Sequence, residues 1–206
     1  MSENATGFPP LKVERKTGDE RFYRNGNPLD LSLLSFWRWS ASDLVSNATR
    51  GILAEYIVAN ALGLADGVRA EWDAFDLLTK DGLKIEVKSA AYLQSWHHKK
   101  LSVITFGIRP TRLWNATTNE LATELKRQAD IYVFCVLSHK EKDSLDPLNL
   151  DQWEFYILRA SVLDKKFLTQ KTIGVASLLK LNPYIAKYEE IAGCIEKLSG
   201  EIKRAS

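Results

Sequence analysis

The strongest constraint on the fold is a nearly continuous apolar run, IYVFCVL, between Asp130 and Ser138. The run has the length of a β-strand, and its β-branched and aromatic side chains favour an extended backbone. A strand with one face in water would alternate apolar and polar residues, so this run indicates a strand that is covered on both faces. We therefore expect an α/β protein whose central sheet is flanked by helices.

Periodicity predicts the elements that precede this strand. Apolar side chains recur at helical spacing over 48–62, which predicts a helix that ends at Gly63, and Ser42 is the expected N-cap of a segment broken near Asn47. The other predicted elements before the apolar run are strands over 73–79, 83–90 and 101–108 and a second helix over 120–128. The predicted order as far as Ser138 is αβββαβ.

The rest of the chain is expected to pack on this core. A strand over 153–158 and an amphipathic helix over 184–198 would extend and cover the sheet, because the C-terminal segment is too short for an independent core. We predict one domain over 1–206, with a core at 42–138 and with 1–41 and 139–206 packed on it. The aromatic segment 36–39 is expected in the core or in an interface.

Composition excludes several classes of protein. The 206 residues are 45% hydrophobic and carry a net charge of +2, so any nucleic-acid binding needs a local basic patch. No apolar run has the length of a membrane span and the N-terminus lacks a signal-peptide segment, so a soluble cytoplasmic protein is expected. Cys135 and Cys194 stand far apart without further ligands at zinc spacing, and both are expected to be buried thiols.

The segment between Asp76 and Lys88 predicts a β-hairpin with a polar face. Lys80-Asp81-Gly82 suits a three-residue loop with glycine in the left-handed region, which would place Asp76 opposite Glu86 on the same face as Lys88. Asp73 would then lie on the other face. A two-residue loop would shift the register by one and separate Asp76 from Glu86.

Two carboxylates and a lysine at this spacing suit a particular chemistry. Carboxylate oxygens are the ligands that Mg²⁺ prefers, and an ammonium beside the attacking water supports the hydrolysis of a phosphodiester. Asp76 and Glu86 are the expected metal ligands, and Lys88 is the expected catalytic cation. The alternative is a solvated strand face, on which exposed Glu and Lys side chains often stand two residues apart.

This motif and the αβββαβ order resemble the catalytic core of the PD-(D/E)xK nuclease superfamily, which includes Type II restriction enzymes. The resemblance covers roughly 42–138 and adds Glu55, in RGILAEYIV, as the acid of the first helix. It implies that Asp76, Glu86 and the Val87 carbonyl hold the metal, that Glu55 supports it, and that Lys88 orients or activates water. One departure from the family pattern is Phe75, which stands where many members have proline.

Several polar residues outside the motif are further candidates. Gln94 would lie on the active face if the strand continued straight beyond Lys88, and it is otherwise a surface residue that follows the strand. Arg50, on the helix of Glu55, is either a phosphate clamp or an exposed helix residue. The other candidates for phosphate binding, or else for a solvated surface, are Lys99, Lys100, Arg109 and Arg112.

The resulting hypothesis is a Mg²⁺-dependent DNA endonuclease of restriction, defence or repair type. Mn²⁺ is expected to substitute for Mg²⁺, double-stranded DNA is the expected substrate, and a homodimer is expected on symmetry grounds. The alternatives are a catalytically inactive nuclease fold that binds nucleic acid and an assembly protein that docks through its aromatic segment.

Overall fold

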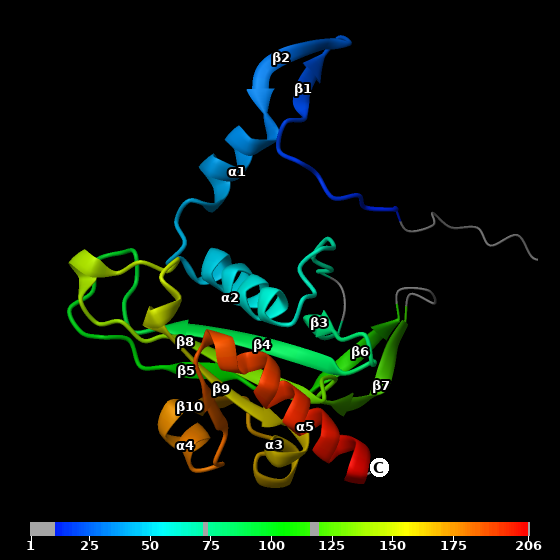
Figure 1. The fold of residues 1–206 in the computed structure, drawn as a ribbon, viewed down its shortest axis with the longest axis vertical. Helices are drawn as coiled ribbons and strands as arrows, with labels where there is room; N and C mark the ends of the chain where they lie inside the picture. The colour runs from blue at the N-terminus through cyan, green and yellow to red at the C-terminus, as the bar shows by residue number, and fades with distance from the viewer. Residues whose placement is uncertain (1–10, 72–73, 116–119, 206) are drawn as a thin grey trace, which may run out of the picture.

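A five-stranded mixed sheet forms the centre of the molecule (Figure 1). The structure is a computed structural model that describes residues 11–71, 74–115 and 120–205. The strands of this sheet are β3 (Leu77–Leu78), β4 (Lys84–Ala91), β8 (Ile131–Leu137), β9 (Trp153–Arg159) and β11 (Tyr184–Ala186). Their order is β11-β9-β8-β4-β3; β4 and β8 run parallel, and the other neighbours run antiparallel. The predicted mixed α/β architecture is confirmed.

Strand β8 lies in the middle of the sheet and is buried at every position, as its apolar run predicts. Val133 and Cys135 face one side, where α2 (Asn47–Ala61) and α5 (Ile191–Ala205) cover the sheet. Tyr132 and Phe134 face the other side and pack in a second cluster. The elements that contribute to this second cluster are α3 (Ala160–Lys166), α4 (Val175–Leu179), β5 (Thr105–Gly107) and β10 (Thr172–Gly174). Helices therefore flank both faces of the sheet.

The connection from β4 to β8 differs from the predicted one. The segment that was expected to be a helix over 120–128 is strand β7 (Glu120–Lys126), which pairs with β6 (Thr111–Asn115) in a hairpin. Leu121 and Leu125 fit helical spacing, but backbone pairing with β6 overrides that local preference, and both side chains stay exposed. The strand predicted over 101–108 is regular only at β5, which pairs with β10 outside the main sheet.

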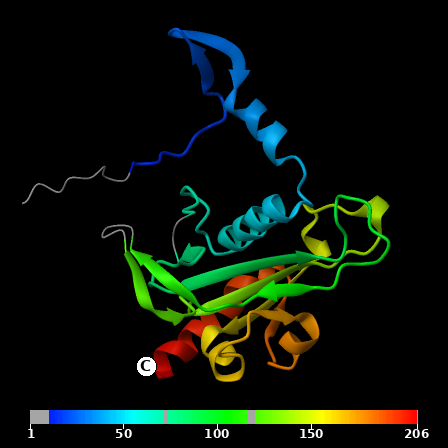
Figure 2. The same cartoon turned by 180° about the vertical axis from the view of Figure 1, so that it is seen from behind.

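The N-terminal part of the chain stands away from the sheet in Figures 1 and 2. It consists of the hairpin β1 (Arg21–Arg24) and β2 (Asn27–Ser32) and of helix α1 (Leu33–Ala41), none of which was predicted. Trp37 and Trp39 on α1 are 38% and 84% exposed, so the aromatic segment is not part of this chain's core. Ser42 caps the C-terminal end of α1, and the N-cap of α2 is Ser46, because the turn between the two helices separates them.

The C-terminal part of the chain extends the sheet and covers it. Strand β9 lies where a strand was predicted, but the helix predicted over 184–198 begins later, because the chain first forms β11 at the sheet edge. Short 3₁₀ turns complete the fold at Lys142–Ser144, Leu150–Gln152 and Tyr188–Glu190. Cys135 is buried, as expected, and Cys194 is only partly buried. Within the described ranges, no helix combines the length and the apolar character that crossing a membrane requires.

A buried arginine ties the second core cluster together. The Arg127 side chain is fully buried and donates to the carbonyls of Ile108 (2.9 Å) and Phe167 (2.7 Å) and to the Asp164 carboxylate (2.6 Å). We expect Arg127→Met to lower the free energy of unfolding by about 2–4 kcal/mol, because two carbonyls and a carboxylate lose their charged donor. Urea denaturation measures the loss. Lys126→Met, at the exposed neighbouring position, is the control and should leave stability nearly unchanged.

Candidate active site

The β3–β4 hairpin has the predicted loop and register. Gly82 has a φ of +85°, in the left-handed region, and the Thr79 N–H donates to the Leu83 carbonyl at 2.9 Å. Leu77 is paired with Ile85 and Leu78 with Lys84, as a three-residue loop requires. The predicted loop and the pairing of Leu77 and Leu78 are therefore confirmed, but β3 is shorter than the strand predicted over 73–79, and Asp76 lies just before it. Asp73 lies outside the described residues.

This register places the Asp76 carboxylate against the backbone of β4. The Asp76 N–H donates to the Ile85 carbonyl (3.0 Å), and Asp76 Oδ2 accepts the Val87 N–H (2.7 Å). Burial and then the nearby charge of Glu86 raise the pKa of Asp76 to about 6, and Glu55 adds to this effect. The Val87 hydrogen bond and the charge of Lys88 act in the opposite direction. Asp76 is thus crowded by the other two predicted acids.

Each of the other two acids has a cation as its partner. Lys88 Nζ donates to Glu86 Oε1 on the same strand, and Arg69 binds Glu55 through both Nε and Nη2. The Glu86 and Glu55 side chains are only 18% and 13% exposed, so the two acids are largely withdrawn from water, whereas their cations remain partly exposed. In the part of the chain that the structure describes, no three acidic, histidine or cysteine side chains are arranged to hold a metal ion.

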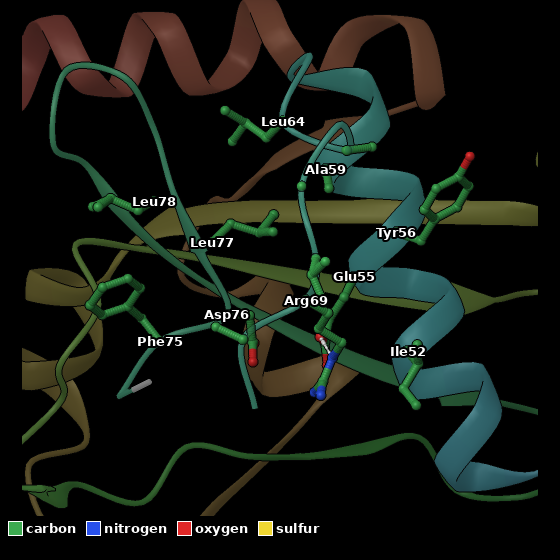
Figure 3. Close-up of a pocket in the computed structure, with 14 residues that line it drawn as sticks. Ile52, Glu55, Tyr56, Ala59, Leu64, Arg69, Phe75, Asp76, Leu77 and Leu78 are labelled. Carbon is green, nitrogen blue, oxygen red and sulfur yellow. Dashed lines mark hydrogen bonds and ion pairs between the residues drawn. The ribbon is translucent and has the colours of Figure 1, made fainter. Parts of the chain in front are cut away.

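Two cavities flank these groups. The first, of about 320 Å³, is lined by Glu55, Arg69 and Asp76 together with apolar side chains of α2 and β3. Figure 3 shows the Glu55–Arg69 pair and the Asp76 carboxylate in the same part of this cavity. The second, of about 340 Å³, has a basic lining around the Glu86–Lys88 pair. Its lining residues are Glu86, Lys88, Gly107, Arg109, Thr111, Tyr132 and Lys171.

Two residues predicted for the site make hydrogen bonds within the protein and do not face the candidate active site. Arg50 is buried and donates to the Val45 carbonyl and to Asn47 Oδ1, both at 2.7 Å, so it holds the turn before α2 and is not presented to a phosphate. Strand β4 ends at Ala91, so the straight extension expected to carry Gln94 to the active face does not exist. The buried Gln94 amide donates to the Ala91 carbonyl and to Ser102 Oγ.

The other predicted basic residues are exposed. Arg109 lines the second cavity beside Lys88, and Arg112 lines an adjoining cavity that Arg109 also borders. Lys99 and Lys100 are exposed on the loop that follows β4. The sequence did not predict Arg69 or Lys171 as site residues. Arg69 lines the first cavity and Lys171 lines the second.

The raised pKa of Asp76 has a consequence for stability without metal. Its pKa is about 6 in the folded state and 3.8 ordinarily, so above pH 6 the ionised carboxylate costs the folded state up to about 3 kcal/mol. That cost shrinks as the pH falls below 6 and disappears only below the ordinary pKa of 3.8, where both states are protonated. We therefore expect Asp76→Asn to be more stable than the parent at pH 7.5 in EDTA, and equal to it near pH 3. Thermal unfolding across this range measures the difference.

Asp81, in the loop of the same hairpin, is the control, because removing its charge should change the stability in the opposite direction. Its hydrogen bonds from Lys203 and Thr79 lower its pKa, so its charge stabilises the folded state above the ordinary pKa, and that contribution is lost at lower pH. Asp81→Asn should accordingly lose stability at pH 7.5. A gain in both variants would show a general effect of net charge.

One family model matches most of the chain, including the part that carries the candidate active site. The model of the bacteriophage T4 endonuclease IV family matches residues 30–174, well over half of the 206 residues. The match includes the β3–β4 hairpin, Glu55 and both cavities. A search among curated proteins gives no match. The chain therefore belongs to the bacteriophage T4 endonuclease IV family, and it is a deoxyribonuclease.

Proposed function

We propose that this endonuclease is Mg²⁺-dependent, with Asp76 and Glu86 as metal ligands and Glu55 in support. The observation that carries the proposal is the gathering of three carboxylates around the start of the β3–β4 hairpin; burial, and then the charges of Glu86 and Glu55, raise the pKa of Asp76 to about 6. A divalent cation would relieve this crowding, and an all-carboxylate set of oxygens suits Mg²⁺ or Mn²⁺.

The Val87 carbonyl completes the proposed ligand set. In an extended strand, the N–H and C=O of one residue point to the same side of the strand. Because the Val87 N–H donates to Asp76, the Val87 carbonyl also faces the side of Asp76. With this carbonyl, the proposed donor set would be that of the PD-(D/E)xK superfamily, and membership of that superfamily is part of the proposal.

Each residue has a separate role in hydrolysis. A bound divalent ion would lower the pKa of its water and neutralise charge on the phosphate. Lys88 holds or offsets the charge of the attacking oxygen, because its ammonium lies beside Glu86. Arg109 and Lys171 line the same cavity as Lys88 and bind phosphates of the substrate. Arg112, Lys99 and Lys100 extend this contact along the DNA.

Double-stranded DNA and a homodimer complete the proposal. Two copies related by a two-fold axis would place one site on each strand of a duplex. Sedimentation of the protein on a short DNA duplex in Ca²⁺ tests the dimer and should detect two copies of the chain on one duplex. A single copy that cuts both strands of a duplex would contradict the proposed dimer.

Plasmid cleavage tests the metal dependence. Purified protein that has been stripped with EDTA should leave supercoiled plasmid intact, and added Mg²⁺ or Mn²⁺ should restore nicking or linearisation. Cleavage that persists undiminished in EDTA would exclude a metal-dependent mechanism. No cleavage with either ion would favour an inactive relative that only binds DNA.

A further inference from the structure

Arg69 reaches the candidate active site through a reversal of the chain after α2. Gly63 has a φ of +64°, and the Leu64 N–H donates to the Ala59 carbonyl at 2.8 Å, so the chain turns back along the helix. Arg69 thereby meets Glu55 and binds both of its carboxylate oxygens. The pKa of Arg69 is raised by this hydrogen bond, and Asp76 adds to the effect through its charge.

The charges of this cluster are balanced only in part. Glu55, Asp76 and Glu86 carry three negative charges when ionised, and Arg69 and Lys88 carry two positive charges, which leaves a net charge of −1. A divalent ion changes this sum to +1. One of the two cations then becomes available to a phosphodiester group, which carries one negative charge.

The surroundings of Arg69 suit a change of partner. Its side chain is 37% exposed, whereas that of Glu55 is 13% exposed, so the arginine approaches the acid from the solvent side. Both residues line the cavity of about 320 Å³ that also contains Asp76. A guanidinium group can bind either a phosphate or a carboxylate in the same bidentate geometry, with two parallel hydrogen bonds.

We propose that Arg69 is the counterion of Glu55 in the metal-free site and that it binds a DNA phosphate when a divalent ion takes its place. This inference rests on the proposed function, because it requires a metal beside Asp76 and Glu55. It makes Arg69 a competitor of the metal and a ligand of the substrate. Its loss should therefore shift the two binding equilibria in opposite directions.

Two binding measurements on the full chain test this role. In calorimetry with Mn²⁺ alone, Arg69→Ala should bind the ion about tenfold more tightly than the parent, which corresponds to about 1.4 kcal/mol. In fluorescence anisotropy with a short DNA duplex and Ca²⁺, the same variant should bind DNA about tenfold more weakly. In EDTA the two proteins should bind DNA alike.

Two control variants separate this role from a structural one. Arg15 donates to the Asp66 carbonyl (2.9 Å) and so fixes the same loop, and Arg15→Ala should leave the affinity for Mn²⁺ unchanged. Arg69→Lys keeps the charge but not the bidentate geometry, and it should bind Mn²⁺ like the parent and DNA more weakly.

Equal or weaker Mn²⁺ binding by a folded Arg69→Ala protein would overturn the inference and leave Arg69 as a support of the loop. If Asp76→Asn loses Mn²⁺ binding in the same experiment, the proposed function survives that result. If Asp76→Asn binds Mn²⁺ as the parent does, the metal lies elsewhere, and both the inference and the proposed function fail.

Discussion

Lys88→Ala is expected to cleave DNA about 100- to 1000-fold more slowly than the parent while it still binds the metal and DNA. The Lys88 ammonium lies beside Glu86 and lines the basic cavity, so it is placed to offset charge on the attacking oxygen. Its loss removes stabilisation of the transition state but no metal ligand. Single-turnover cleavage at saturating Mg²⁺ measures the effect.

Lys80→Ala is the matched control, since Lys80 is exposed in the loop of the same hairpin and its removal changes the net charge equally. It should cut at the parental rate. If Lys88→Ala also cuts at the parental rate, Lys88 has no chemical role, and the proposed mechanism is contradicted.

Asp76→Asn is expected to abolish cleavage, with a loss on the order of 1000-fold or more. Bound metal contributes several kcal/mol to the stabilisation of the transition state, and about 4 kcal/mol corresponds to three powers of ten in rate. The Asn side chain can still accept the Val87 N–H that Asp76 accepts, so the hairpin should remain intact. Single-turnover cleavage of the same plasmid measures the rate.

Asp73→Asn provides the comparison for this result. Asp73 stands three residues before Asp76 and lies outside the described residues; the alternation of a strand over 73–79, as predicted from the sequence, would put it on the opposite face. We expect Asp73→Asn to cut nearly as fast as the parent. The reverse pattern, with Asp73 essential and Asp76 dispensable, would show that Asp73, and not Asp76, binds the metal.

The parts of the fold that could be predicted are those with local causes. The β3–β4 register follows from Gly82 and the three-residue loop, and both act within one hairpin. The burial of β8 on both faces follows from its own apolar run. Because the loop fixes the hairpin register, the placement of Asp76 beside the strand of Glu86 could also be predicted from the sequence.

The parts that could not be predicted depend on pairing between distant segments. Leu121 and Leu125 suit a helix, and only the pairing with β6 makes their segment a strand. Lys171 enters the basic cavity because its carbonyl accepts the N–H of Ile108 where β10 joins β5. Arg69 reaches Glu55 through a loop whose path no local pattern specifies. A charged residue without a motif gives no signal of the partner that it will meet.

Divalent-ion binding by the purified chain tests the central claim most directly, namely that the carboxylates of the β3–β4 hairpin hold the metal. Calorimetric titration with Mn²⁺ should detect binding to the parent and its loss in both Asp76→Asn and Glu86→Gln, since each variant replaces an anionic ligand by a neutral side chain of similar shape. Circular dichroism should show that both variants are folded. Mn²⁺ binding of parental strength in both variants would place the metal elsewhere and contradict the claim.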